Sequence, residues 1–397
     1  MSDEKKIKLC MISYSQYEDD SRIYRYARAL IKKGCQVDMI GLGAVGQPKA
    51  DSFEGVNIYR LQTRDFAETT PFSYLWRLSC FFWKSTFYAT KLYFKNRYHV
   101  IHYHNIPDGG IFCTLIPKLM GAKIILDIHD VVPEFYMRKF NVDESHLIIK
   151  FLKWVEKISS QFADHVITVT DIWKERLNQR SVRSEKCSVI MNVPDSELFR
   201  SEICPKKKHK EPFIFSYHGN LSETTGVETA INAFAKGYDQ MPNAILRIIG
   251  QGRNKEKYIQ LIQQLKIEHA IQMLKIVPVK KIPQLLCEAT VGLDPKESGV
   301  YAGETLSVKA MEYLGMKIPV IVSRTTAANY YFDETMVAFF TPSNSDELKE
   351  KMVELYQKEE LRELLSRNSQ KFNNKYNWTN FEKKYFEIIG VLLGKSI

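Results

Sequence analysis

One segment of the sequence, residues 303–320, combines residue types that could bind a phosphorylated ligand. Glu304 and Glu312 lie eight residues apart in it, with Ser307 and Lys309 between them. A helix that begins near Ser307 would direct free backbone N–H groups and the positive end of its dipole at an anion. Lys309 would add a point charge, and Glu312, on nearly the same helix face, could accept two hydrogen bonds from a ribose diol. The alternative is an ordinary amphipathic helix with solvated charges, and the spacing alone does not decide between them.

The elements that would position this segment form two α/β units in tandem. Short apolar runs without polar alternation are separated by helices, which is typical of parallel sheets buried on both faces. The pattern predicts a Rossmann-like, doubly wound domain at 1–200, a linker at 201–212, a second such domain at 213–378 and a C-terminal helix at 379–397 that packs back on the first domain. We therefore expect the two domains to face each other across a ligand-binding cleft.

The charge of the chain is concentrated in two places. The 397 residues carry a formal net charge of +10, and their composition excludes a disordered or collagen-like chain. Five cations fall in the acid-free stretch 69–107, and a second basic run lies at 206–210. Because nucleic-acid-binding proteins usually spread basic stripes over their recognition elements, this distribution argues against a nucleic-acid partner.

Residues 71–98 have the composition of a helix that contacts a membrane surface. They include eleven aromatic residues, and Arg77, Lys84 and Lys91 recur every seven residues on one stripe. This pattern favours an interfacial helix on anionic lipid, although the aromatic residues could instead be the core under a covering helix. No apolar run long enough to span a membrane is present, and residues 1–6 lack the apolar core of a signal peptide. We expect a cytoplasmic protein bound peripherally to the inner face of the membrane.

The seven cysteines are scattered and form no C-x-x-C pair. This favours reduced, buried thiols over disulfides or a zinc site. The pairs Asp19-Asp20 and Asp127-x-x-Asp130 have no further ligands near them in the sequence, so we expect no metal.

Several motifs, in order along nearly the whole chain, resemble the retaining glycosyltransferases of family 4, which have the GT-B fold. They are the Glu304/Glu312 pair followed by E-Y-L-x4-P-V at 312–320, Y-H-G-N-L at 217–221, I-I-G-Q-G at 248–252, and the segments 162–170 and 189–195. The segments L-D-I-H-D at 126–130 and P-E-F-Y at 133–136 resemble a subgroup that builds bacterial surface polysaccharides.

This resemblance implies a role for particular residues. The implied catalytic residues are His129, Glu304 and Lys309. The implied donor-binding residues are Gly219, Asn220, Gly250, Arg253, Val277, Thr305, Leu306, Ser307 and Glu312. The implied acceptor-side residues are Asp19, Asp20, Arg22, Asp130 and Glu134. In particular, Glu312 would bind the ribose hydroxyls, and Lys309 with the backbone at 305–307 would hold a diphosphate.

The reaction that the resemblance implies moves a sugar from a nucleotide-sugar donor, with UDP expected, to a lipid-linked or polysaccharide acceptor. It would need no cofactor beyond the donor and no protein nucleophile, because the leaving diphosphate oxygen would take the acceptor proton while the enzyme supplies charge and positioning.

The sequence also departs from the family pattern. Many relatives carry an arginine and a lysine beside the glycines of the second-domain turn, where this chain has Asn220 and Thr225. Lys309 and side chains such as Arg253 would compensate, or the protein is a weak or inactive relative that acts as a nucleotide-sugar-binding scaffold. A nucleotide-sugar epimerase on the same fold is a further alternative. The glycine pair of the first loop is replaced by residues 18–22, which leaves the acceptor open.

Overall fold

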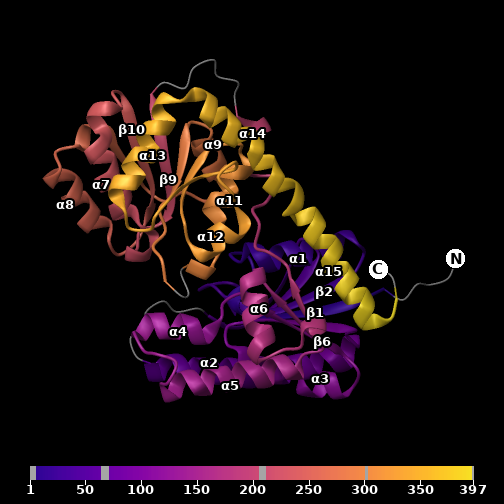
Figure 1. The fold of residues 1–397 in the computed structure, drawn as a ribbon. Helices are drawn as coiled ribbons and strands as arrows, with labels where there is room; N and C mark the ends of the chain where they lie inside the picture. The colour runs from indigo at the N-terminus through magenta and orange to yellow at the C-terminus, as the bar shows by residue number, and fades with distance from the viewer. Residues whose placement is uncertain (1–5, 64–70, 205–211, 300–302, 396–397) are drawn as a thin grey trace. The chain divides into compact units, whose positions relative to one another are not determined.

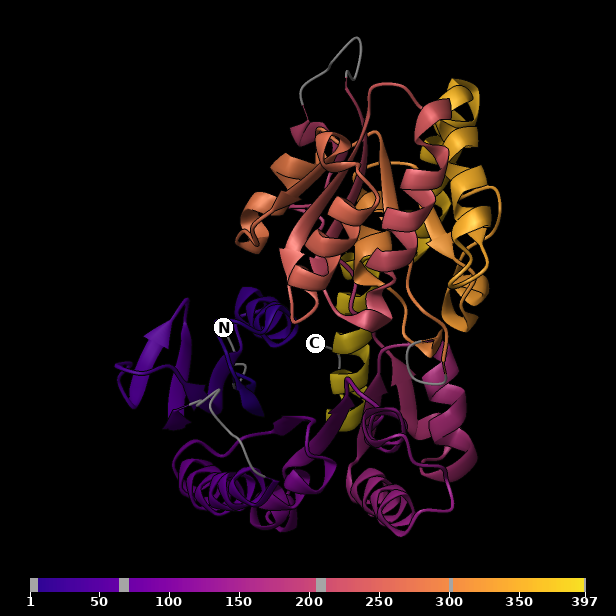
Figure 2. The ribbon, with the colours of Figure 1, turned by 90° about the vertical axis from the view of Figure 1, so that its left-hand side faces the viewer.

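The computed structural model of the chain describes residues 6–63, 71–204, 212–299 and 303–395. These residues form two compact units, each with a sheet of its own (Figures 1 and 2). The first unit contains residues 1–192 and 381–397, and the second contains residues 193–380. The chain therefore leaves the first unit, completes the second, and returns to the first at its end.

The first unit is built on an eight-stranded sheet with the order β3-β4-β2-β1-β5-β6-β7-β8. Neighbouring strands pair in parallel, except that β3 and β4 form an antiparallel hairpin at one edge. The strands are β1 (Lys8–Gln16), β2 (Gln36–Gly43), β3 (Ala50–Phe53), β4 (Val56–Thr63), β5 (Val100–His104), β6 (Lys123–Ile128), β7 (His165–Thr168) and β8 (Cys187–Val189). The helices are α1 (Ser21–Lys32), α2 (Pro71–Asn96), η1 (Asp108–Thr114), α3 (Leu115–Leu119), α4 (Val132–Phe140), α5 (Leu147–Phe162), α6 (Asp171–Arg180), η2 (Ser184–Lys186) and α15 (Trp378–Leu393).

Alternate residues of the central strands face two different helical layers, because successive side chains of a strand point to opposite faces. Tyr103 of β5 belongs to the core that includes Phe81 of α2. His102, one residue earlier, points the other way and contacts Tyr26 of α1 and Tyr385 of α15. The C-terminal helix thus covers the sheet face opposite to α2.

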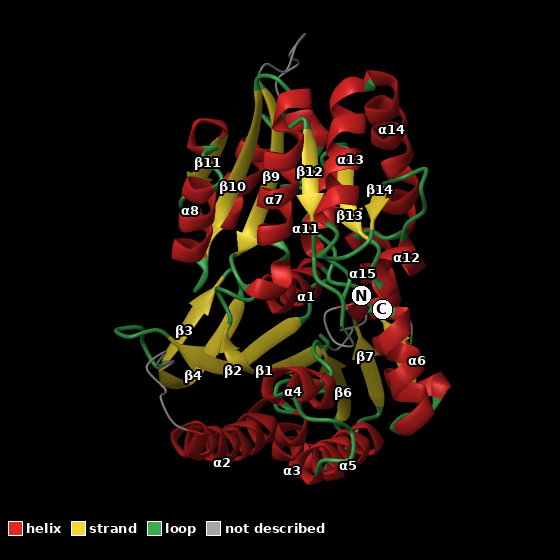
Figure 3. Cartoon of the chain, turned by 60° about the vertical axis from the view of Figure 1, so that its left-hand side comes forward, coloured by secondary structure: helices red, strands yellow, loops and turns green. Residues whose placement is uncertain are grey.

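The second unit is built on a six-stranded, parallel sheet with the order β11-β10-β9-β12-β13-β14 (Figure 3). The strands are β9 (Phe213–Asn220), β10 (Ala244–Gln251), β11 (Ile271–Leu274), β12 (Val291–Asp294), β13 (Val320–Ser323) and β14 (Ala338–Phe340). The α-helices are α7 (Val227–Gly237), α8 (Lys255–Gln264), α9 (Ile282–Leu286), α11 (Val308–Gly315), α12 (Thr326–Tyr331), α13 (Ser345–Gln357) and α14 (Glu359–Lys375). Single 3-10 turns are η3 (Ser201–Ile203), η4 (Glu223–Thr225), η5 (Tyr238–Gln240), η6 (Glu268–Ala270) and η7 (Val279–Lys281).

The predicted architecture of two Rossmann-like, doubly wound domains is confirmed, but the boundary differs from the predicted one. The first unit ends at Asn192 instead of residue 200. Residues 193–200 join the second unit, where the backbone of Phe199 packs so closely on α11 that a Cβ added to Gly315 would lie 2.9 Å from its carbonyl oxygen. In the predicted linker, residues 205–211, including the basic run 206–210, lie outside the described residues, as do residues 1–5.

The prediction of reduced cysteines is wrong for one pair. Cys204 and Cys287 form a disulfide, with Cα atoms 5.1 Å apart and 83 residues of separation in sequence. The fold brings together two cysteines that no local motif connects, so their spacing in the sequence could not indicate the disulfide. The other five cysteines are free, and Cys10, Cys35, Cys113 and Cys187 are buried.

No helix in the described part of the chain is both long enough and apolar enough to cross a membrane.

Candidate functional site

The second unit gathers polar side chains at the end of β9, beside a reversal of the strand order. The chain runs outward from β9 to β10 and β11, then returns to β12 on the other side of β9. Ligands of open α/β sheets bind outside the carboxyl ends of the strands at such a switch point. Here β9 ends in His218, Gly219 and Asn220, and β12 ends in Asp294.

Glu312 of α11 is held at this strand end by a histidine. Its Oε2 lies 2.5 Å from His218 Nε2, and His218 Nδ1 lies 3.0 Å from the hydroxyl of Tyr313. The Tyr313 hydroxyl donates to the carbonyl oxygen of Ser216 at 2.6 Å, which anchors α11 to β9. Only 9% of Glu312 is exposed. The carboxylate that the sequence assigns to a ribose diol is therefore fixed in a buried network.

Lys309, one turn earlier in α11, lies over the same strand end. Its Nζ is 3.6 Å from Asp294 Oδ1 and 5.3 Å from the centre of the Tyr217 ring. Burial acts to lower the pKa of Lys309, but Tyr217, Asp294 and Glu312 together raise it above its usual range, so the side chain is a cation. Gly219 has φ of +131°, and a Cβ there would approach Lys309 Cδ to 3.2 Å. Glycine is thus needed both for the backbone conformation and for the close approach.

The loop before α11 contains the other residues predicted to hold a diphosphate. Thr305, Leu306 and Ser307 are half-buried, and Ser307 is the N-cap of α11, although its side chain makes no capping hydrogen bond at this described helix end. Lys296 Nζ donates to the carbonyl oxygen of Thr305 at 2.8 Å and also contacts the Thr305 hydroxyl. Glu304 is half-buried directly before this loop. Lys296 is a second cation beside the loop, and the sequence did not single it out.

The remaining predicted donor-site residues lie along the same edge of the sheet. Gly250 of β10 pairs with Gly219, and a Cβ on Gly250 would lie 2.1 Å from the Gly219 carbonyl oxygen. Asn220 is exposed at the end of β9. Arg253 is exposed between β10 and α8, and Val277 is half-buried after β11. The structure therefore joins Gly250, Lys309 and Glu312 around the end of β9, while Arg253 and Val277 follow the ends of the next two strands.

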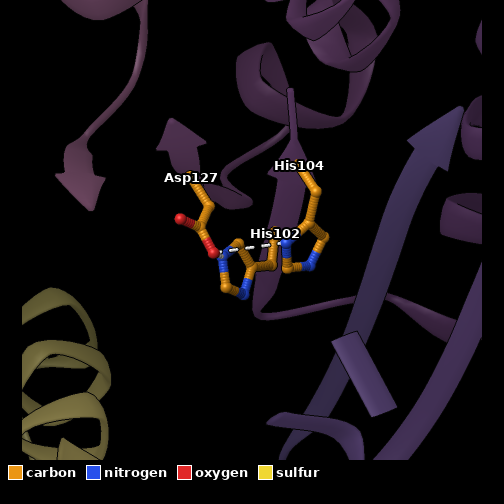
Figure 4. Close-up of side chains that lie close together, drawn as sticks. All are labelled: His102, His104 and Asp127. Carbon is orange, nitrogen blue, oxygen red and sulfur yellow. Dashed lines mark ion pairs between the residues drawn. The ribbon is translucent and has the colours of Figure 1, made fainter. Parts of the chain in front are cut away.

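The first unit holds His129 in a buried cluster of histidines around one carboxylate. Asp127 Oδ2 lies 2.9 Å from His129 Nε2, 3.3 Å from His104 Nδ1 and 3.4 Å from His102 Nε2. Figure 4 shows how Asp127, from β6, meets the two histidines of β5. Burial acts to raise the pKa of Asp127, but the three histidines hold it well below its usual range.

The histidines of this cluster differ from ordinary surface histidines. Burial and then the neighbouring His104 lower the pKa of His102 to about 4, and burial lowers the pKa of His104 as well. Both imidazoles are therefore neutral at pH 7. His102, His104 and Asp127 each offer an atom of the kind that binds a divalent cation, and these atoms lie within 4.8 Å of one another.

Asn105 fixes the backbone that follows His129. Its Oδ1 accepts from the backbone N–H of His129 at 2.8 Å and of Asp130 at 3.4 Å, and its Nδ2 donates to the Asp130 carbonyl oxygen at 2.7 Å. The same Nδ2 donates to Asp108 Oδ1 at 2.8 Å. The backbone of Asp130 is thus fixed by Asn105, and neither Asn105 nor Asp108 was predicted.

Three predicted acceptor-side residues line one cavity of about 290 Å³ at the end of β1: Asp19, Asp20 and Arg22. Ser15, Gln16, Ser21 and Asn192 complete its lining. Asp20 is the N-cap of α1 and pairs with Arg22 at 3.3 Å. Burial acts to raise the pKa of Asp20, but Arg22 and the nearby His129 lower it. Asp20 therefore connects this cavity electrostatically with the histidine cluster.

Glu134 is the exception among the acceptor-side residues. Its side chain is buried in the first unit, and both oxygens accept from Arg180, at 2.6 and 2.9 Å. Arg176 adds a third contact at 3.3 Å. Because α6 occupies both carboxylate oxygens, the predicted acceptor-side role is corrected: Glu134 links α4 to α6.

The basic stripe predicted for residues 71–98 lies on a single helix, α2, and two of its cations are engaged. The Arg77 guanidinium contacts the carbonyl oxygen of Thr63, and Lys84 Nζ donates to that of Leu61 at 3.3 Å. Lys91 is exposed. The alternative that the aromatic residues are core fails for Trp76, Trp83, Phe87 and Phe94, which are 63%, 67%, 63% and 52% exposed.

Comparisons with known proteins agree with this fold. Residues 21–198 match the family model described as Glycosyltransferase Family 4, and residues 199–372 match Glycosyl transferases group 1. The structure is similar to that of Anabaena Alr3699/HepE in complex with UDP and glucose, with a TM-score of 0.71 and 14% identity, covering 97% of this chain and 100% of that one.

Two curated relatives are similar over part of the chain. The chitobiosyldiphosphodolichol beta-mannosyltransferase of Candida glabrata is 24% identical over 233 residues, which are 51% of this chain and 51% of that protein. The WcaL glycosyltransferase of Escherichia coli K12, provisionally named for colanic acid biosynthesis, is 27% identical over 159 residues, 40% of this chain and 39% of that protein. The chain thus spans about half or less of the length of these relatives.

Two doubly wound domains of this kind make up the GT-B fold, which is the class of fold that this chain shares with solved glycosyltransferase structures. The chain belongs to glycosyltransferase family 4.

Proposed function

We propose that the protein transfers a sugar from a UDP-linked donor to a lipid-linked or glycan acceptor, with retention of anomeric configuration, in the synthesis of a bacterial surface polysaccharide. The observation that carries the proposal is the meeting of Lys309 and Glu312 with Gly219 and His218 at the end of β9. Two similar proteins support it: one is named for colanic acid biosynthesis, and the Anabaena structure contains UDP and glucose.

In this proposal α11 binds the nucleotide part of the donor. Glu312, oriented through Oε2 by His218, accepts from the ribose hydroxyls, and Lys309 with the N-terminal end of α11 faces the diphosphate. Lys296, which donates to Thr305, supplies a second positive charge near that loop. It compensates for the arginine and lysine that many relatives carry at the positions of Asn220 and Thr225. Charge placed in advance at the leaving group lowers the barrier to transfer.

The chemical step exchanges one bond at the anomeric carbon. The bond from this carbon to the diphosphate oxygen breaks, the bond to the acceptor oxygen forms, and the acceptor proton passes to the departing diphosphate. His129, Asp20 and Arg22 of the first unit serve the acceptor side in this scheme, and the cavity at the end of β1 receives part of the acceptor.

A thermal-shift screen tests donor binding. UDP-, GDP- and TDP-sugars are added to the full chain, and a UDP-sugar is expected to raise the melting temperature most, since a ligand stabilises the state that it binds. Slow hydrolysis of the same donor without acceptor should follow, and the anomeric coupling in the product measured by NMR reports retention. Binding without hydrolysis or transfer would favour the second candidate, an inactive nucleotide-sugar-binding relative, which the Asn220 and Thr225 departures motivate. No shift with any donor contradicts the proposal.

We also propose that the protein works at the inner face of the cytoplasmic membrane, bound to anionic lipid through the outer surface of α2, α3 and α5. These three helices pack on η1 and form one layer of the first unit (Figure 1). Thirteen of the twenty-two large exposed hydrophobic side chains of the described residues belong to or directly follow these helices. They are Leu75, Trp76, Trp83, Phe87, Phe94, Leu115, Ile116, Leu119, Met120, Leu147, Ile148, Phe151 and Trp154.

Cations accompany this apolar surface. Lys91 and Lys95 of α2 and Lys150 and Lys157 of α5 are exposed beside the aromatic residues. Tryptophan with lysine on one helix face is the composition of a segment that lies in the headgroup region of an anionic bilayer. The sequence identified the α2 part of this surface, whereas α3 and α5 emerge only from the fold.

Sedimentation with phosphatidylglycerol vesicles tests the location. The double variant Trp83→Ser/Trp154→Ser should bind these vesicles at least several-fold more weakly than the unaltered chain. The matched control is Tyr330→Ser/Leu364→Ser, which removes two exposed side chains from the second unit. Equal loss in both variants, or no loss in the first, refutes the proposed surface.

A further inference from the structure

The spacing of polar residues on β5 and at the end of β6 is that of a metal site built on two strands. His102 and His104 are separated by one residue, and so are Asp127 and His129. Residues two apart on a strand point to the same face, and the parallel register places His104 opposite Asp127. The topology therefore delivers three possible metal-binding side chains, those of His102, His104 and Asp127, to one face of the sheet, beneath α1 and α15.

The distances between the donor atoms fit a small divalent cation. Asp127 Oδ2 lies 3.4 Å from His102 Nε2 and 3.3 Å from His104 Nδ1. Ligands bound tetrahedrally to zinc, at about 2.0–2.1 Å from the metal, are separated by about 3.3 Å. His129 Nε2 lies 2.9 Å from Asp127 Oδ2 and 3.2 Å from His104 Nδ1, so it borders this group of three donors.

The cluster is deeply buried, and His102 Nε2 in it has no hydrogen-bond partner among the residues that the structure describes. His102 and His104 are 0% exposed and Asp127 is 1% exposed. Because buried polar atoms are nearly always paired, this nitrogen indicates a missing partner. A cation between His102, His104 and Asp127 would satisfy it.

The residue next to His102, outside the cluster, also fits a metal site. The Nδ1 of His102, on the far side of its ring, lies 2.9 Å from the hydroxyl of the fully buried Tyr385. A metal-binding histidine almost always has such a partner for its other nitrogen, which fixes the ring orientation.

We propose that His102, His104 and Asp127 bind one zinc-type divalent cation in the first unit. The cation would hold Asp127 beside His129, but it takes no part in the proposed transfer reaction. Its three protein ligands are two imidazoles and one carboxylate, which are donors that zinc accepts, and a metal bound there would stabilise the fold around it. The proposed site departs from the sequence expectation of no metal, which rested on aspartates alone and did not consider the two histidines of β5.

The test uses the full chain and zinc chloride alone. After incubation with zinc and gel filtration into metal-free buffer, elemental analysis should find about one zinc per chain, and a chelator should then lower the melting temperature. Cobalt(II) should replace zinc and give the visible absorption of a four-coordinate site. A chain that stays free of zinc after this treatment, with an unchanged melting temperature, overturns the proposal and leaves a purely hydrogen-bonded cluster.

Two variants locate the metal. Tyr385→Phe keeps the ring and removes only the hydroxyl at His102, and it should weaken zinc binding about 10–100-fold without unfolding the chain. His102→Gln should abolish stoichiometric zinc. The matched control is His165→Gln, a half-buried histidine of β7 that bonds Ser188 and lies outside the cluster. Zinc retained equally by His102→Gln and by the control would show surface binding and overturn the assignment.

Discussion

Glu312 and His218 form a buried pair in which each side chain fixes the position of the other. His218 lies at the end of a buried strand, where an imidazole without a hydrogen-bond partner would cost stability. Without His218, the carboxylate of Glu312 would rotate freely. Their 2.5 Å contact leaves the second carboxylate oxygen of Glu312 oriented for a ligand. The sequence pointed to Glu312 through its spacing from Lys309, but His218 could not be assigned, because its partner lies 94 residues away.

Replacing Glu312 by glutamine should weaken UDP binding by about 10–100-fold, since a hydrogen bond to a charged group contributes about 1.5–3 kcal/mol. Isothermal titration calorimetry with UDP measures the change. Glu256→Gln, an exposed glutamate in the first turn of α8, is the control and should bind as the unaltered chain does. A Glu312→Gln variant with full affinity would remove α11 from the donor site.

Asp108 makes the stability of the first unit depend on pH. Burial, and then the negative charge of Glu156, raises the pKa of Asp108 to about 7. The unfolded carboxyl ionises near its ordinary value of about 3.9. Between these two values the folded chain binds more protons than the unfolded chain, so this group makes the free energy of unfolding fall as the pH rises from about 4 to about 7.

Asp108→Asn should remove this dependence and, relative to the unaltered chain, gain stability as the pH rises through that window. The gain at pH 7.5 is at most about 4 kcal/mol, at about 1.4 kcal/mol per pKa unit. Urea unfolding at pH 5 and pH 7.5 measures it, with the exposed Asp239→Asn as control. A difference between variant and parent that does not change with pH would show that Asp108 is ionised in the folded chain.

Among the elements, those with strong apolar runs were predictable and those at the edges were not. The apolar pattern predicts strands at 7–14 and 35–42 and a helix at 22–33, and β1, β2 and α1 lie within two residues of these ranges. Burial on both faces of the sheet produces such a clear apolar pattern. The β3–β4 hairpin escaped prediction because all four residues of β3 are exposed. The helices α13 and α14 follow mixed polar sequence whose few buried residues, such as Met352, gave no clear signal.

The disulfide between Cys204 and Cys287 joins the start of the second unit to the segment after α9. Closing a loop of this length restricts the unfolded chain, so Cys204→Ser should lower the free energy of unfolding by about 2–4 kcal/mol under oxidising conditions. Urea unfolding with and without dithiothreitol measures the effect. Cys80→Ser removes a free cysteine and should leave the curve unchanged. If reduction does not destabilise the unaltered chain, the bond contributes nothing to its stability.

At the scale of the whole molecule, the net charge of +10 bears on where the protein binds more than on what it binds. Vesicle binding should weaken several-fold when the salt concentration rises from about 0.1 to about 1 M, because screening shortens the Debye length from about 10 to about 3 Å. Part of the vesicle binding should persist at high salt, because the tryptophans of α2 and α5 would contribute to it by burying apolar surface in the lipid. Sedimentation with anionic and neutral vesicles measures both parts, and salt-independent binding that is equal on both lipids would contradict a role for the charge.

The class of the fold and half of the proposed donor site could be predicted from the sequence, since Lys309, Glu312, Gly219 and Gly250 lie in motifs with fixed local spacing. The histidine cluster, the Asn105 network and Lys296 could not, because each depends on residues from separate strands or loops that only the folded sheet aligns. Glu134 was misassigned for the same reason, as the arginines that bind it lie 42 and 46 residues later.

The return of the chain to its first unit has a consequence for synthesis on the ribosome. Domains usually fold in order as they emerge, the N-terminal one first. Here residues 1–192 emerge without Tyr385, which fills the space beside His102 and Tyr26. Until the second unit has been translated, the part of that sheet face that α15 covers therefore stays exposed beside α1. A nascent chain that stalls before residue 381 would expose this part to chaperones and proteases.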